Sequence, residues 1–230
     1  MFKFVQALMF TAVFIAAPPV GRAVSAQTDE ADRIREAVVV FDEVMRAPDN
    51  AIPGSVLGKA EGIAIFPGTL RGGFILGAQR GRGILSAKDP NTGEWSAPAF
   101  LTLTGGSIGA QIGGQSVDLI LIIQNRRGLE YLLRNNFKIG AGASVAAGPV
   151  GRDATASTDI QLRAEILSYS RARGLFAGVS LEGSSVRADR DANRRFYGRA
   201  YNSRQVVFDA RGGKPDPVPE WLETLKKYVG

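Results

Sequence analysis

Residues 62–87 of this chain read GIAIFPGTLRGGFILGAQRGRGILSA, and this stretch decides the fold. Short apolar runs at 62–66, 73–78 and 83–87 are separated by two breaks, Pro67-Gly68 and Gly81-Arg82-Gly83. Short apolar runs bounded by such residues are typical of β-strands joined by tight turns. Glycine also occurs inside the runs, which indicates strong bending or close approach of two backbones. The stretch therefore predicts a strongly curved sheet.

The flanking sequence extends this pattern and adds helices. Further strands are expected at 100–104, 117–123, 164–170 and 175–181, and the second of these is apolar enough to be buried on both faces. Helices are expected at 28–47, 55–60, 126–134, 189–197 and 220–228. The predicted fold class is α+β: a curved, glycine-rich antiparallel sheet or partial barrel with helices packed on it.

Composition excludes most catalytic chemistry. The 230 residues include 28 glycines but neither cysteine nor histidine. Disulfides, thiol nucleophiles, Ser-His-Asp triads and ordinary zinc sites are therefore ruled out. A G-x-S-x-G motif at 105–109 lacks a histidine base, and the alternating oxygen ligands from Asp189 lack the glycine and glutamate of a calcium loop. We expect no enzyme activity, no cofactor and no metal.

The N-terminus has the features of an export signal. Lys3 precedes an apolar run at 4–17, and small residues lead to Ala26. A retained membrane anchor is the alternative. The expected organisation is a signal peptide at 1–26, an N-terminal helix at 27–48, a main domain at 49–212, and a proline linker with an amphipathic helix at 213–230. We expect a periplasmic or secreted protein, peripheral to a membrane, after cleavage near Ala26.

Arginine dominates the positive charge, outnumbering lysine 21 to 7. Its planar guanidinium is suited to bidentate binding of phosphate. Residues 187–204 hold six arginines with Phe196, Tyr197 and Tyr201 between them, a mixture typical of surfaces that meet lipid head groups. The alternative is a solvated helix face whose arginines pair with nearby aspartates. No nucleic-acid-binding motif is present, so no nucleic-acid partner is expected.

Several motifs, in order along the chain, resemble the SYLF domain family. They cover roughly residues 45–200: Ile52-Pro53, Gly62-Ile63-Ala64-Ile65, Gly73-Phe74, Gly81-Arg82-Gly83, Trp95-Ser96-Ala97-Pro98-Ala99-Phe100, Ser107 to Gly113, Gly148-Pro149-Val150-Gly151-Arg152, Ser168-Tyr169-Ser170, Gly174 to Leu181 and Phe196-Tyr197-Gly198. The helix at 28–47 and the proline-linked tail lie mostly outside the match.

The resemblance implies a lipid-binding module, because eukaryotic relatives bind phosphoinositides and some bind actin. Actin is not expected in a periplasm, and a protein partner stays unknown. The helix at 28–47 carries a net charge of −3, which does not suit attraction to an anionic bilayer. The expected ligand is anionic phospholipid or a membrane surface. The predicted contacts are Arg71, Arg80, Arg82, Lys88, Arg152, Arg194, Arg195, Arg199, Phe196 and Tyr197.

Two other functions stay open from the sequence. A structural or partner-binding protein of the cell envelope would use these arginines for solubility only. A carboxylate-dependent hydrolase would need two acids in one cleft, and the candidates are Asp118, Glu165 and Glu182.

Overall fold

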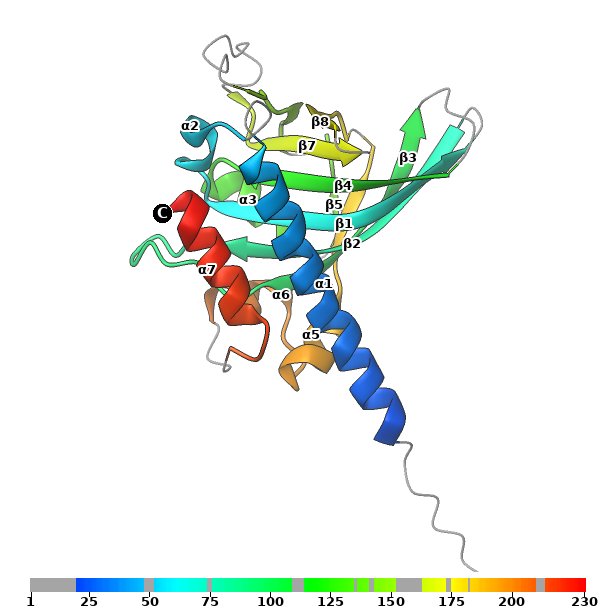
Figure 1. The fold of residues 1–230 in the computed structure, drawn as a ribbon, viewed down its shortest axis with the longest axis vertical. Coiled ribbons are helices and arrows are strands. Elements are labelled where there is room, and N and C mark those ends of the chain that lie inside the picture. The colour runs from blue at the N-terminus through cyan, green and yellow to red at the C-terminus, as the bar shows by residue number, and fades with distance from the viewer. Residues whose placement is uncertain are drawn as a thin grey trace, which may run out of the picture.

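A computed structural model describes residues 20–47, 52–73, 76–108, 114–134, 136–140, 143–151, 163–172, 175–181, 183–209 and 214–230 (Figure 1). Within them, nine strands form one sheet in the order β5-β9-β3-β2-β1-β4-β7-β6, with β8 also paired to β7. Their bounds are β1 (Gly62–Gly73), β2 (Leu76–Ala87), β3 (Ala99–Ile108), β4 (Gly114–Ile123), β5 (Phe137–Lys138), β6 (Val145–Ala147), β7 (Ile166–Ala172), β8 (Leu175–Gly178) and β9 (Ser185–Ala188). The predicted α+β fold with a curved sheet is confirmed. All strand pairs are antiparallel except β6 with β7, which is parallel.

Helices pack on both faces of the sheet. They are α1 (Val20–Arg46), α2 (Gly54–Leu57), α3 (Arg126–Leu132), α5 (Arg190–Tyr197), α6 (Ser203–Phe208) and α7 (Val218–Val229). Helix α1 crosses the sheet with α7 beside it, and the far ends of β1 to β4 project past α1 (Figure 1). Buried residues of α1, α2, α5 and α7 share one core, whereas those of α3 and α6 share the core on the opposite face. We call these two sides the α1 face and the α3 face.

Helix α1 begins at Val20, eight residues before the start predicted at residue 28. A start at residue 28 would put Asp29, Glu30 and Asp32 in the first turn, but they lie inside the helix. Residues 20–28 contain no proline, and Ala23, Ala26 and Gln27 are good helix formers, so nothing ends the helix at Thr28.

The three apolar runs of residues 62–87 form two long strands, not three short ones. Pro67-Gly68 is a bulge inside β1, with Gly68 at φ +54. The bend predicted at Gly81-Arg82-Gly83 is wrong, because β2 pairs with β3 without a register shift from Leu76 to Leu85. Glycine is needed at 83 since a Cβ there would lie 2.2 Å from the Ile65 carbonyl oxygen. This glycine allows close packing rather than a turn.

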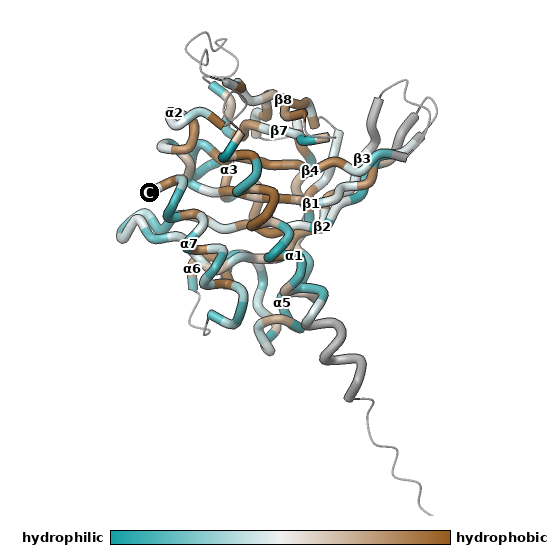
Figure 2. Tube along the Cα trace, in the orientation of Figure 1, coloured by the Kyte–Doolittle hydropathy of each residue, from teal (hydrophilic) through white to brown (hydrophobic). Residues whose placement is uncertain are grey.

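The centre of the sheet is apolar on both faces, as Figure 2 shows along β1 and β4. Ile120 and Ile122 of β4 face the α1 core, while Leu119 and Leu121 face the α3 core. All four are fully buried, which confirms the prediction for this strand. Alternation of side chains along a strand explains how one run fills two cores.

The C-terminal helix α7 belongs to the same packed unit. Trp221 is fully buried and lies edge-to-face against Phe41 of α1, with ring centroids 6.0 Å apart. Tyr228 of α7 donates its hydroxyl to Asp42 of α1 at 2.6 Å. None of the helices in the described ranges is both long and apolar enough to cross a bilayer.

Candidate anion-binding surface

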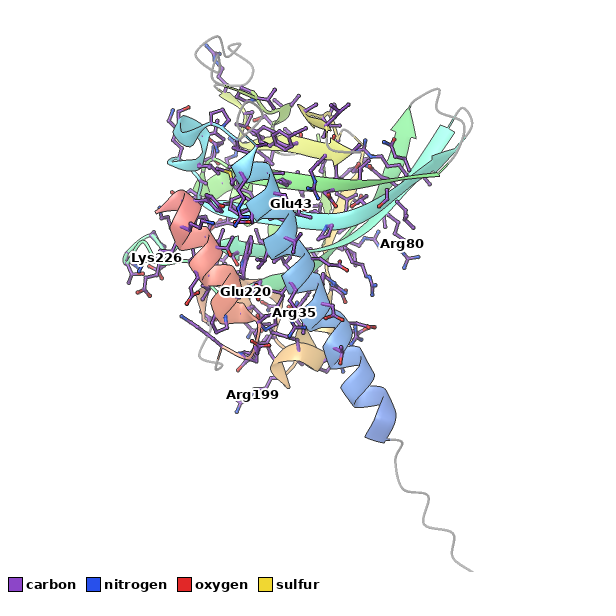
Figure 3. The ribbon with its side chains drawn as sticks, in the orientation of Figure 1. Arg35, Glu43, Arg80, Arg199, Glu220 and Lys226 are labelled. Carbon is purple, nitrogen blue, oxygen red and sulfur yellow. The ribbon has the colours of Figure 1, made fainter. Side chains whose placement is uncertain are left out.

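The predicted contact residues do not form one patch. Arg152 lies outside the described residues. The others come from β1, from β2 and the residue after it, and from α5 and the loop after it. In Figure 3, Arg80 lies near the projecting strands, and Arg199 points away from the opposite end of the body.

Among the predicted contact residues, Arg80 and Arg82 lie side by side and line a cavity. They alternate with Gly81 on β2, so both project from one side of the strand, and both are exposed. They line a cavity of about 650 Å³ between β2, the β1 bulge and α1. Across it, α1 presents carboxylates, so this site is mixed in charge rather than basic.

Arg71 and Lys88 lie elsewhere. Arg71 is half-buried, and its Nε donates to Gln79 Oε1 at 3.1 Å. Burial of the Arg71 guanidinium lowers its pKa from the ordinary value. The Lys88 ammonium lies 5.8 Å from the centroid of the Trp95 ring, one residue after β2 ends.

Helix α5 carries the aromatic–arginine mixture, but its aromatic residues face the core. Phe196 is 3% exposed, and the Tyr197 hydroxyl donates to the Pro98 carbonyl at 2.6 Å. Both rings pack near Phe100. The expectation that Phe196 contributes to a surface is therefore wrong, because its ring packs between α5 and β3, where burial of apolar area stabilises the helix. Tyr197 is half-buried, and its hydroxyl is held by Pro98.

The α5 arginines differ in their partners. Arg194 pairs with Asp191 within the helix, and Arg195 donates to the buried Glu30 of α1 at 2.7 Å. Arg199 is exposed, on the loop after α5. Asp189 caps the helix by accepting a hydrogen bond from Ala192 N at 3.1 Å. Asp189 thus opens a basic helix and pairs with Arg33 of α1, while Asp191 pairs with Arg194. The alternative raised from the sequence, pairing of arginines with nearby aspartates, therefore holds for Arg194, whereas Arg195 pairs with a glutamate of another helix.

A second group of arginines gathers on the α3 face. We call it the α3–α6 arginine cluster, and its members are Arg126, Arg127, Arg134 and Arg204. Arg126, Arg127 and Arg134 line a hollow of about 370 Å³ together with Glu130 and Tyr131. Asn125 caps α3 by accepting from Gly128 N at 2.8 Å, which fixes the helix that presents them.

Aromatic rings hold these guanidinium groups. Arg134 lies 4.2 Å and Arg127 lies 5.7 Å from the centroid of the Tyr131 ring. Arg126 and Arg204 lie 4.1 Å and 5.4 Å from the Phe208 ring of α6. Cation–π contacts of this kind orient a guanidinium without neutralising it.

Acidic residues balance the cluster only in part. Glu130 lies 3.6 Å from both Arg126 Nε and Arg204 Nη2, a distance too long for a hydrogen bond. Glu165, which is nearly buried, lies 3.2 Å from Arg127 Nε. A hydrogen bond to the Tyr131 side chain, the largest cause, and the charge of Glu165 raise the pKa of Arg127. Four arginines against two glutamates leave a positive surface that can accept an anion.

The spacing of residues in the sequence could have indicated two of the four arginines in this cluster. Arg127, Tyr131 and Arg134 are spaced by four and three residues, so they share one side of a helix. Arg204 comes from a distant helix, and only the packing of α6 beside α3 places it near Glu130.

The structure argues against the hydrolase alternative for two of its three acids. Asp118 accepts two hydrogen bonds from Arg171, and Glu165 accepts from Ser144 N. The backbone N–H of Gln124, the residue after β4, donates to the backbone carbonyl of Glu165. Gln124 is six residues from Asp118 in extended chain, so the two acids lie about 20 Å apart. Paired glycosidase carboxylates lie within about 10 Å. Glu182 lies outside the described residues.

Two other motifs have packing roles. Residues 105–108 of the G-x-S-x-G motif lie in β3, as expected for a strand of small residues. Gly148 N donates to the Ser168 carbonyl, and a Cβ at 148 would lie 2.0 Å from Tyr169 Cζ. The residues described here include no group of three acids that could hold a metal ion.

A curled sheet with helices on both faces, carrying a partly neutralised arginine surface, has the features of a binding domain. The family model for Ysc84, described as Las17-binding protein actin regulator, matches residues 104–228. The chain belongs to this Ysc84 (SYLF) family, so the resemblance inferred from the sequence is confirmed. The match extends into α7.

Relatives span much of the chain. Human SH3 domain-containing YSC84-like protein 1 is 35% identical over 192 residues, or 82% of this chain and 55% of the relative. Protein YSC84 of Saccharomyces cerevisiae is 32% identical over 211 residues, which cover 90% of this chain and 44% of the relative. This chain thus spans about half the length of these relatives. The family description is that of an actin regulator that binds a protein, not of an enzyme.

Proposed function

We propose that this domain binds anionic phospholipid head groups through the α3–α6 arginine cluster. The observation that carries the proposal is the placement of Arg127 and Arg134 on the ring of Tyr131, beside a hollow that Arg126 also lines. A phosphate that enters the hollow can accept hydrogen bonds from two guanidinium groups at once.

The exposure of these side chains supports this function. Arg127 is 71% exposed and Arg204 is 57% exposed, so both can reach a bilayer surface. Arg126 also lines the hollow, and its side chain is 38% exposed. Tyr131 is half-buried and suits the boundary between head groups and acyl chains.

The opposite face is less suited to an anionic bilayer. The exposed side of α1 carries Asp29, Asp32, Glu36 and Glu43 against Arg35 and Arg46. These carboxylates would repel anionic lipids at low salt. We therefore propose that the α3 face, not α1, meets anionic lipids.

The test uses sedimentation with vesicles of neutral phosphatidylcholine, with or without anionic phosphatidylglycerol. We expect co-sedimentation with the anionic vesicles only. The variant Arg127→Gln/Arg134→Gln should bind about 30-fold more weakly, since each arginine near such a surface contributes about 1 kcal/mol. The matched control Arg194→Gln/Arg199→Gln removes the same charge at α5 and should change binding less than about threefold.

Three results would overturn the proposal: no binding to either vesicle, equal binding to both, or equal losses in the two double variants. The last would mean that total charge, not this cluster, drives binding. Binding restricted to a protein partner would instead favour the envelope partner-binding alternative.

We also propose that the chain is exported and cleaved near Ala26. That bond lies within α1, so cleavage would shorten the helix to a start at Gln27 and leave its sheet contacts beyond residue 28 in place. N-terminal sequencing of protein from a periplasmic fraction tests this. An intact N-terminus, or recovery only in the cytoplasm, would contradict it.

A further inference from the structure

The cavity between α1 and β2 has opposite charges on its two walls. The α1 wall presents Asp29, Asp32 and Glu36, spaced so that they share one side of the helix. The β2 wall presents Arg80 and Arg82, and all five side chains are exposed. Pro67, Gly68 and Leu70 of the β1 bulge complete the lining. The cavity volume of about 650 Å³ falls in the range of small-ligand sites.

These charges do not neutralise one another directly. Within the described residues, no ion pair joins Arg80 or Arg82 to any acid, and Asp29 and Glu36 have none either. Asp32 pairs with Arg35 at 2.9 Å. The opposite charges therefore do not pair across the cavity, and a molecule that carries both signs can bridge them.

Arg33 adds a buried guanidinium to the lining. Its side chain is only 4% exposed, and it is held by Asp189 at 3.2 Å and by the Phe100 ring at 5.1 Å. Its Nη2 lies 3.9 Å from Oε1 of the buried Glu30, too far for a hydrogen bond, and has no acceptor among the described residues. Burial is the largest cause that lowers the pKa of Arg33, and the charge of Arg82 lowers it further, so an anion beside both guanidinium groups would offset these effects.

From this arrangement we infer that the cavity binds a phosphoethanolamine group, with the phosphate on Arg80 and Arg82 and the ammonium on the carboxylates of α1. A primary ammonium supplies three N–H donors for these carboxylates, and the phosphate accepts from the guanidinium forks. A purely anionic ligand would meet the acids, and a purely cationic ligand would meet the arginines. The site is separate from the α3–α6 arginine cluster and does not depend on the function proposed there.

Titration calorimetry of the purified full chain with O-phosphoethanolamine tests the inference. We expect saturable binding that is at least tenfold tighter than binding of inorganic phosphate or ethanolamine alone. Arg82→Gln and Glu36→Gln should each weaken it at least tenfold. The control Arg127→Gln/Arg134→Gln should leave it unchanged, while Arg82→Gln and Glu36→Gln should leave sedimentation with anionic vesicles unchanged. Circular dichroism and thermal unfolding verify that the variants fold.

The source of the group is decided with phosphatidylcholine vesicles that contain or lack phosphatidylethanolamine. If more protein binds to the vesicles that contain phosphatidylethanolamine, and Arg82→Gln and Glu36→Gln remove this difference, the ligand is a lipid head group. Binding of the soluble ester without enrichment supports the site with a soluble ligand. Absence of binding in both assays, equal affinity for inorganic phosphate, or affinity unaffected by either variant would overturn the inference.

Discussion

The indole Nε1 of Trp221 donates a hydrogen bond to Ser86 Oγ at 2.8 Å, and both side chains are fully buried. This contact joins the last helix to the second strand across 135 residues of sequence. It explains why α7 is part of the family domain: the helix closes the core on the α1 face. Without it, Phe41 and the sheet beneath would be exposed to water.

Replacing Trp221 should therefore destabilise the whole fold. We expect Trp221→Ala to lower the free energy of unfolding by about 3–5 kcal/mol, because it removes a large buried side chain. Ser86→Ala should cost about 1–3 kcal/mol by leaving the indole N–H without an acceptor. Urea denaturation measures both, with the exposed Glu223→Ala as control. A Trp221→Ala loss no larger than that of the control would show that α7 does not contribute to the core.

Close packing predicts a cost at Gly83. A Cβ at this position would lie 2.2 Å from the Ile65 carbonyl oxygen and 2.5 Å from the Phe66 ring. Gly83→Ala should lower the free energy of unfolding by about 1–3 kcal/mol, since β1 and β2 must move apart. Gly54→Ala, where no atom lies within 4 Å, is the matched control and should change stability by less than about 0.5 kcal/mol. Equal losses of stability in Gly83→Ala and Gly54→Ala would show that position 83 is not closely packed and would favour the bend expected at 81–83.

Removing the negative charge of Glu130 should strengthen binding to anionic vesicles. Glu130 is the exposed carboxylate of the hollow and faces Arg126 and Arg204, so Glu130→Gln should raise affinity for anionic vesicles. The expected increase is about two- to fivefold, the size of a surface charge interaction. Glu220→Gln removes an exposed carboxylate from α7 and serves as control in the same vesicle titration. Weaker binding by Glu130→Gln would mean that the carboxylate contributes to the ligand site.

The stability of the fold should depend on pH through the carboxyl group of Asp42. A hydrogen bond from the Tyr228 hydroxyl and another from Lys227 lower the pKa of Asp42 below its ordinary value of 3.8. A carboxyl pKa that is lower in the folded state stabilises the protein above the unfolded pKa and loses this contribution as pH falls through the folded value. The wild type should thus be more stable than Asp42→Asn at pH 7, and the difference should shrink below about pH 4.

Denaturation at a series of pH values measures this difference. Tyr228→Phe removes the largest cause of the lowered pKa and should fall between the wild type and Asp42→Asn. A stability difference that is the same at pH 7 and pH 3 would refute the assignment.

The sequence predicted those elements whose pattern is local. The run Leu119 to Ile123 is apolar at every position, so it predicted burial on both faces of the sheet, and these residues of β4 are fully buried. Asp189 before a basic segment indicated the start of α5. The ends of elements were less well predicted, since Pro67-Gly68 looks the same in sequence whether it forms a turn or a bulge.

By itself the sequence determined the α+β class, the family, and the absence of histidine and cysteine chemistry, because composition and periodicity depend on residues near one another. Tertiary structure alone decided which arginines meet. It buried Phe196, paired Arg195 with Glu30, and set Arg204 beside Arg126 on Phe208. The physical reason is that charges act through space, and the distances between side chains on different elements are fixed only when the sheet curls and its helices pack.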